Sequence, residues 1–442
     1  MKYLSHVAVL SSVASLFGAG CGRELVGAPP PLMRPHFPTG LALHPDGGAL
    51  AVVSSNFDLA YNRGAVLLAD LTLVDEAIAT AGGALVRLDD GNSPYVDAGQ
   101  CPSFGDAPLF LGGGRLLLPS REQNQVVDLP MRDDGSIAFA CDPAPEGGDG
   151  QVCGLGARAL QVPGNDPFRV VALSEANGVT RLVLGLLTTP DVLYLEVAGG
   201  ASLDGTLSLT PGLSFSLTGY SSLGEPMGTR GLALRSAQPG APETMFLLVQ
   251  RQSTGLTTNA IDLVWFDASS GGGASLSTLP LTGRTGAVDG RSLVLSQDQS
   301  ALFAALRAPD AIARLDLDVS DGRVVANLGP VTSTCYQPVT LATATVVDVA
   351  GVQHERLYVT CFDNDTIVAY DARSLVETAV VRGLGRGPYG LALDAAHEPP
   401  RAYVSFFEDD TVAVIDLLDD TGAEGMHPRA LIGIPRDERS AP

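Results

Sequence analysis

The chain has 442 residues, a formal net charge of −22 and 45% hydrophobic residues. A surface this acidic is a poor partner for nucleic acid and for an anionic membrane face, so we expect neither as a ligand. Lys2 is the only lysine. Without a later amine the chain cannot form a Schiff base or a phosphate-binding loop, which excludes pyridoxal enzymes and P-loop NTPases.

Residues 1–20 have the features of an export signal. Lys2 gives a positive start, and residues 3–17 are apolar or small, with no acidic residue. This run is shorter than the roughly 20 residues that span a bilayer. The segment LFGAGC, which ends at Cys21, resembles a bacterial lipobox, although Gly18 stands where an aliphatic residue is usual. The resemblance implies that Cys21 carries lipid and anchors the protein to a membrane; ordinary signal cleavage nearby or an uncleaved anchor is the alternative.

Residues 21–36 are predicted to form a stiff tether, because they contain three consecutive prolines and no hydrophobic period. No later apolar run is long enough for a membrane helix. Gly22 follows the cysteine in place of the aspartate that marks inner-membrane retention in lipoproteins. The resemblance therefore implies an outer-membrane lipoprotein of the cell envelope, on either the periplasmic or the surface side.

Residues 37–442 contain seven units of one pattern. The clearest has short strands at 390–393, 402–405 and 411–416, separated by turns rich in Pro, Gly, Asp and Glu. A fourth candidate strand follows each unit, such as GALVRL at 83–88 and GSIAFA at 135–140. The repeat length is about 58 residues, near the longer periods of propeller blades. Four strands repeated seven times predict an all-β fold, a seven-bladed β-propeller of four-stranded blades.

The last two units carry a family resemblance. The segments RLYVTCFDNDTIVAYD at 356–371 and RAYVSFFEDDTVAVIDL at 401–417 resemble YVTN-type propeller repeats, in which Y-V is followed by a polar turn and T-V-x-V-x-D. The resemblance is weaker in the second to fourth units but extends over nearly all of the chain after the tether. It implies the fold and not an activity, because propellers host binding modules, lactonases, lyases and haem enzymes.

No catalytic or metal-binding pattern stands out, and we predict neither a metal nor a cofactor. The histidines after the signal include three in turns of widely separated units, where they cannot converge on one ion. The acidic turns lack EF-hand spacing, and no nucleophile elbow is present. An aspartate ends the third strand in six of the seven units, which favours a structural role for Asp70, Asp128, Asp267, Asp316, Asp371 and Asp416.

The residues that begin the first strands are the best candidates for a binding site, because the first strand of each propeller blade lies nearest the central channel. Alignment on the apolar triplet of each first strand places one residue per blade around a channel mouth: Thr39, Ala107, Arg169, Arg230, Arg291, Gln337 and Tyr389. Arginine suits bidentate binding of carboxylate or phosphate. We predict that Arg169, Arg230, Arg291, Gln337 and Tyr389 bind an anionic ligand; the alternative is that each arginine pairs with a carboxylate of a neighbouring blade, such as Asp166 or Asp289.

Five cysteines remain after Cys21, and an exported protein is expected to pair them. Cys335 precedes a first strand and Cys361 ends the following strand, so antiparallel pairing predicts a disulfide between them. Cys141 and Cys153 flank a Gly/Pro-rich insertion and form the second predicted pair, which leaves Cys101 free. Pairing of Cys101 with either of these two is the alternative.

Three classes of function remain, of which the third is a pure spacer in a multi-protein surface assembly. The first is a non-enzymatic binding or scaffolding lipoprotein for a protein or a small anionic ligand. It is favoured by the aromatic residues in turns, namely Phe57, Tyr61, Phe362, Phe406 and Phe407. The second is a propeller enzyme of lactonase or lyase type, which needs an acid–base pair or metal ligands at one channel mouth.

The lipid anchor can be tested directly. Metabolic labelling with a fatty-acid probe should mark the wild-type protein, and Cys21→Ser should abolish the label because the acceptor thiol is gone. Cys101→Ser is the matched control and should keep it. Label that persists in Cys21→Ser would refute the assignment.

Overall fold

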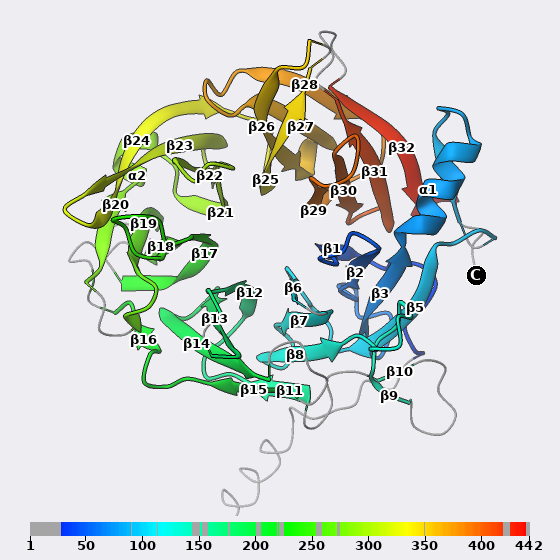
Figure 1. The fold of residues 1–442 in the computed structure, drawn as a ribbon, viewed down its shortest axis with the longest axis horizontal. Helices are drawn as coiled ribbons and strands as arrows, with labels where there is room; N and C mark the ends of the chain where they lie inside the picture. The colour runs from blue at the N-terminus through cyan, green and yellow to red at the C-terminus, as the bar shows by residue number, and fades with distance from the viewer. Residues whose placement is uncertain are drawn as a thin grey trace, which may run out of the picture.

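The computed structural model describes residues 28–89, 91–112, 114–143, 151–152, 158–175, 177–199, 205–218, 220, 225–252, 259–271, 275–348, 350–418 and 425–438. Seven sheets stand in a ring around an open centre, with the first strand of each sheet innermost (Figure 1). The predicted all-β, seven-bladed propeller is therefore confirmed. Among the described residues, no helix has the length and apolar character to cross a bilayer.

The blades follow one another in chain order, and each runs from its inner to its outer strand. Blades 1 to 3 are β1 (Pro38–Leu43), β2 (Ala49–Ser54), β3 (Gly64–Asp70) and β5 (Tyr95–Cys101); β6 (Leu109–Leu111), β7 (Arg115–Ser120), β8 (Gln125–Pro130) and β11 (Ala159–Gln161); and β12 (Pro167–Ala172), β13 (Val179–Leu186), β14 (Asp191–Ala198) and β15 (Thr206–Leu209). Blades 4 and 5 are β17 (Glu225–Arg235), β18 (Thr244–Gln252), β19 (Asn259–Asp267) and β20 (Ser277–Pro280); and β21 (Asp289–Leu295), β22 (Ala301–Arg307), β23 (Ala311–Ser320) and β24 (Arg323–Ser333). Blades 6 and 7 are β25 (Pro338–Val347), β26 (Gln353–Cys361), β27 (Thr366–Asp371) and β28 (Glu377–Arg382); and β29 (Pro388–Asp394), β30 (Arg401–Phe406), β31 (Thr411–Leu417) and β32 (Met426–Ile432).

Short elements decorate this ring. The described helices are α1 (Leu71–Thr80), α2 (Thr282–Thr285) and the single 3₁₀ turns η3 (Phe362–Asn364) and η4 (Arg436–Glu438). The two-residue strands β9 (Asp142–Pro143) and β10 (Gln151–Val152) extend blade 1, and β16 (Phe215–Ser216) pairs with β14.

The predicted outer strands of blades 1 and 2 were wrong. Within GALVRL, β4 (Val86–Leu88) pairs in parallel with β32 of blade 7, and β5 takes its place in blade 1. Within GSIAFA, the structure has only an isolated bridge from Met131 to Phe139, and β11 completes blade 2. The cause in blade 1 is α1, which carries the chain across to blade 7 (Figure 1).

The helix α1 begins where Asp70 ends β3. The Asp70 carboxylate accepts a hydrogen bond from the Thr72 amide at 2.8 Å, which caps the helix N-terminus. Leu71, Val74 and Ile78 recur at helical spacing and are buried. They join one apolar cluster with residues of blades 1 and 7, so this insertion helps to close the ring.

Apolar side chains fill the spaces between blades. Strands β2 and β7, the second strands of blades 1 and 2, are buried along their full length because each lies between two strands of its own sheet and between neighbouring blades. One cluster joins Trp265 of blade 4 to Leu302 of blade 5, and another joins Val414 of blade 7 to Leu67 of blade 1. Each blade is therefore stabilised mainly by its neighbours, which makes closure of the ring a cooperative requirement.

Several of the recurring aspartates form cross-strand ion pairs. The guanidinium Nε atoms of Arg401 and Arg115 lie 2.8 Å and 2.7 Å from the carboxylates of Asp416 and Asp128, respectively. Arg356 and Asp371 make the equivalent contact at 2.9 Å. These carboxylates thus hold second and third strands together, away from the channel.

The cysteines follow the prediction where the structure describes them. Cys335 and Cys361 form the predicted disulfide, with their Cα atoms 5.8 Å apart. Cys101 is a free, buried thiol, and burial raises its pKa to about 12. Cys141 is disulfide-bonded, and its predicted partner Cys153 lies outside the described residues.

Close approach of blade 7 to blade 1 gives a stability prediction. A Cβ atom at Gly390 would lie 2.3 Å from the Thr39 carbonyl oxygen. Gly390→Ala should therefore cost about 1–3 kcal/mol through overpacking, seen as a thermal midpoint lower by several degrees. Gly283→Ala is the control, because a Cβ there meets open space. Equal midpoints for the two variants would contradict tight closure at this seam.

Candidate functional site

A cavity of about 730 Å³ occupies the centre of the ring. Residues of the first strands of all seven blades line it, together with the segment just before β6. Cavities of roughly 300–1,000 Å³ are typical of sites for small molecules. The centre of the propeller is therefore open enough to hold a ligand.

Bulges at the start of the first strands determine which side chains reach this cavity. In blades 4 and 5, Arg230 and Arg291 are the extra residues at which the pairing register shifts. A bulge redirects a side chain, here toward the axis. When the first strands are aligned at these bulges, one cavity-lining residue of each blade is equivalent to Arg230 and Arg291. We call these residues the mouth positions: Thr39, Asp106, Phe168, Arg230, Arg291, Val339 and Tyr389.

The predicted ring is partly wrong in register. Ala107 and Arg169 lie one position beyond the mouth positions, and Gln337 lies two positions before Val339. Gln337 is exposed and does not line the cavity, whereas Arg169, Arg230, Arg291 and Tyr389 do. In blade 6 the error is of two residues, because apolar residues alternate along the strand and a triplet can be matched in two registers. In blades 2 and 3 it is of one residue, because residues 108–111 and 170–173 are uninterrupted apolar runs in which the triplet has no unique start.

Below the mouth the channel becomes apolar. The residues that follow the mouth positions by two form a continuous apolar lining, the waist ring: Leu41, Pro108, Val170, Leu232, Leu293, Leu341 and Leu391. A charged group entering the channel is therefore held at the mouth, because the waist offers it no polar side chain.

Two of the three arginines share one carboxylate. The Nε atoms of Arg230 and Arg291 lie 3.9 Å and 3.7 Å from the Asp289 carboxylate. Arg230 also donates a hydrogen bond to the Gln250 side-chain oxygen at 2.5 Å. The alternative prediction, in which each arginine pairs with a nearby carboxylate, therefore holds in part for Arg230 and Arg291. Both guanidiniums face the single carboxylate of Asp289.

Arg169 stands apart from this arrangement. Its equivalents in the other six blades are Gly40, Ala107, Gly231, Ser292, Thr340 and Gly390, where close packing of neighbouring strands favours small residues. Asp166 pairs with Arg121 at 3.4 Å and not with Arg169. Within the described part of the chain, the Arg169 guanidinium has neither a hydrogen bond nor an ion pair. Burial lowers its pKa, which the Asp106 carboxylate opposes.

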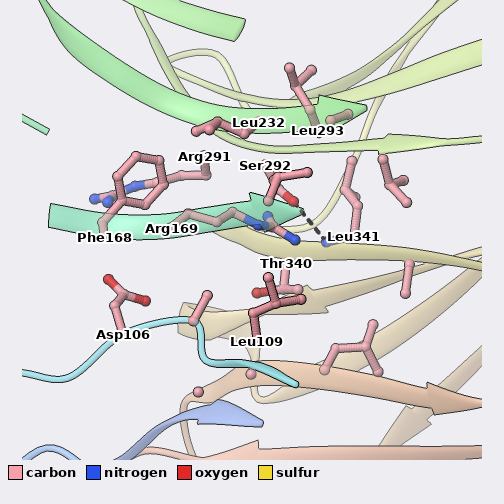
Figure 2. Close-up of a pocket in the computed structure, with 18 of the residues that line it drawn as sticks. Asp106, Leu109, Phe168, Arg169, Leu232, Arg291, Ser292, Leu293, Thr340 and Leu341 are labelled. Carbon is pink, nitrogen blue, oxygen red and sulfur yellow. Dashed lines mark hydrogen bonds between the residues drawn. The ribbon is translucent and has the colours of Figure 1, made fainter. Parts of the chain in front are cut away.

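Asp106 is the residue that sequence reasoning missed. Side chains of Asp106 from blade 2, Phe168 and Arg169 from blade 3, and Arg291 from blade 5 line the same opening (Figure 2). Burial raises the pKa of Asp106 to about 6, although Arg121, Arg169 and Arg291 act in the opposite direction. The charge of the mouth therefore changes near neutral pH. Its sequence signal was weak, since it lies beside the apolar strand start that the alignment selected.

Tyr389 and Arg307 also interact electrostatically with the charged residues of the mouth. The Asp106 carboxylate raises the pKa of the Tyr389 phenol, and burial adds to this effect. Burial lowers the pKa of Arg307 to about 10, with Arg291 acting in the same direction. Arg307 donates to the Pro338 carbonyl at 3.1 Å. Within the described ranges, no three His, Cys, Asp or Glu side chains are grouped as metal ligands would be.

Fold and mouth together define a seven-bladed propeller with a cationic central opening. No family model and no curated protein matches the sequence, so the resemblance to YVTN-type repeats stays limited to the segments that suggested it. Hydrazine synthase of Kuenenia stuttgartiensis is similar in structure, with 13% identity, a TM-score of 0.53 and coverage of 89% of this chain and 99% of that chain. A periplasmic gluconolactonase of Pseudomonas aeruginosa has 15% identity, a TM-score of 0.51 and coverage of 78% and 84%. At such identities the similarity shows the fold alone.

The raised pKa of Asp106 predicts a pH effect on stability. Between about pH 4 and pH 6 the folded state keeps a proton that the unfolded state releases, so stability falls as pH rises through this window. Asp106→Asn should remove this fall, which is at most about 3 kcal/mol, and raise the thermal midpoint at pH 7. Asp133→Asn, in an exposed turn, is the control. Unchanged pH dependence in Asp106→Asn would contradict the assignment.

Proposed function

We propose that this protein is a binding propeller of the cell envelope, anchored by lipid at Cys21, that holds a small organic anion in its central mouth. The observation that supports this proposal most directly is Arg169, a half-buried guanidinium that lines the cavity without an ion-pair partner among the described residues. A positive charge that is partly removed from water and makes no ion pair is costly. A bidentate carboxylate or phosphate would supply that compensation.

Arg230 and Arg291 support the same ligand. Each is held near Asp289 at a distance longer than a good charge-assisted hydrogen bond, so both guanidiniums keep donors for a ligand. The rest of the molecule is strongly acidic, with a net charge of −22. A positive mouth in such a protein favours anions locally while the acidic surface repels nucleic acid.

The proposed anchor enters the propeller on the mouth side. The Ala28 carbonyl accepts a hydrogen bond from the Asn62 amide at 3.0 Å, and Asn62 lies in the loop between β2 and β3, on the face where the first strands begin. Six residues lie between Cys21 and Ala28, so the chain between them reaches at most about 25 Å. Lipid at Cys21 would therefore hold the mouth face near the membrane.

A lactonase is the second candidate, and Asp106 is the observation that favours it. A carboxyl with a pKa of about 6 beside arginines can take a proton from a water that attacks a lactone carbonyl, while the guanidiniums stabilise the oxyanion. Hydrolysis of glucono-δ-lactone by the wild type but not by Asp106→Asn would support this candidate. A rate no greater than in buffer would exclude it for that substrate and leave binding intact.

The binding proposal is tested with inorganic phosphate as the probe. The wild type should bind phosphate in calorimetry at low salt, and replacing Arg169, Arg230 and Arg291 together by Gln should weaken binding by about ten-fold or more. The thermal midpoint should fall only modestly, because Arg169 has no ion pair to lose, the contacts of Arg230 and Arg291 with Asp289 are long, and the one short hydrogen bond lost is that of Arg230 to Gln250.

Arg181→Gln is the matched control. Arg181 pairs with Glu196 at 3.3 Å on β13, and it does not line the cavity, so phosphate binding should stay at the wild-type level. A triple variant that unfolds much earlier, together with a wild type that binds no phosphate, would show that the arginines are structural.

A further inference from the structure

Aromatic side chains gather beside the cationic mouth. The cluster, which we name the aromatic shelf, contains Phe37, Phe57, Phe104, Phe362, Tyr389 and Phe407. Its centre is Phe407, whose ring centroid lies 5.3 Å from that of Phe57, 5.8 Å from Tyr389 and 5.9 Å from Phe362. Aromatic residues make up only 6% of the sequence, so composition does not account for this gathering.

The shelf is open to solvent on one side. Phe57 is 57% exposed, and Phe362 and Phe407 are half-buried. Phe406, which the sequence also suggested for a surface, is instead part of the core at 1% exposed. A contiguous group of rings that are exposed or half-buried marks an interaction surface, whereas single exposed apolar residues do not.

Tyr389 connects the shelf to the cavity. Its ring contacts Phe407 and Phe362, and the same residue occupies a mouth position that lines the cavity. The shelf residues come from blades 6, 7 and 1 and from the entry to blade 2, whereas the arginines come from blades 3, 4 and 5. One half of the rim is therefore aromatic and the facing half is cationic.

We propose that the ligand is a small anion whose charged group is attached to a flat apolar ring, such as an aryl phosphate or an aryl carboxylate. The ring lies on Phe57 and Phe407, and the charged group reaches the arginines across Tyr389. This inference rests on the proposed function and narrows its ligand class. Phenylalanine rings offer stacking but no hydrogen bonds, so a flat apolar ring fits them better than a hydroxyl-covered sugar.

A small molecule fits this site better than a protein partner. The shelf leads into a cavity of about 730 Å³, and the charged groups lie inside that cavity and not on a flat rim. Protein partners usually bury about 800 Å² of each surface, centred on a broad apolar patch. Here the apolar surface is confined to a few rings at the edge of a pocket.

The test compares phenyl phosphate with inorganic phosphate on the whole chain. Stacking of the phenyl ring should make phenyl phosphate bind at least about five-fold tighter. Phe57→Ala and the double variant Phe57→Ala/Phe407→Ala should bring the ratio of the two dissociation constants toward one. Phe57→Leu keeps an apolar side chain without a flat ring and should lower the ratio in the same direction.

Leu73→Ala is the matched control, because Leu73 is an exposed apolar residue, 42% exposed, on α1 and far from the mouth. It should leave the ratio at the wild-type value. Equal affinities for the two phosphates in the wild type, or a ratio unaffected by the Phe57 variants, would overturn the aromatic ligand class alone. Failure of both phosphates to bind would instead overturn the proposed function.

Discussion

The bulge at the start of the inner strand is the constraint on which the site depends. In six blades the pairing between the first and second strands shifts register at this point, and the isolated bridge of Gly105 to Ser120 marks the same place in blade 2. The bulged residue faces the cavity, whereas the next residue, which also borders the cavity in most blades, lies close against the neighbouring blade. A Cβ at Gly40, for example, would lie 2.3 Å from the Asp106 carbonyl oxygen. The fold thus favours a small side chain at the second position, the residue after the bulge. It leaves the bulged residue itself free to be a functional side chain.

This division explains how a repeating scaffold acquires an asymmetric site. The mouth positions hold different side chains in most blades, while the waist ring below them stays apolar throughout. Arg169 breaks the rule for the second position, the residue after the bulge, where five other blades have Gly, Ala or Ser and the sixth has Thr. A large cationic side chain at a position that packing favours as small has a stability cost. That cost is easier to explain by a ligand than by the fold.

The repeat pattern predicted the fold well because it depends on features that each blade carries locally. Alternating apolar runs and acidic turns define a strand without reference to the rest of the chain. The partner of a strand in the sheet, in contrast, cannot be recognised from local sequence. Nothing in GALVRL indicates that Val86 pairs with Ala430 at the other end of the chain. The same contrast explains why only part of the site was predicted. Arg230, Arg291 and Tyr389 follow the repeat register and were found from it. The mouth positions Asp106 and Val339 depend on where each strand bulges, and apolar alternation does not reveal a bulge.

The two ends of the chain also take part in building the aromatic half of the rim. The Asp410 carboxylate accepts hydrogen bonds from the Phe37 amide at 2.6 Å and from the Arg436 Nη2 at 2.7 Å. Although burial acts to raise it, these bonds and one from His36 hold the pKa of Asp410 below its usual value, so the carboxylate stays ionised. The Arg436 guanidinium lies 3.5 Å from the centroid of the Phe37 ring. The N-terminal segment that leads from the proposed anchor is therefore fixed against the C-terminal segment at the shelf itself.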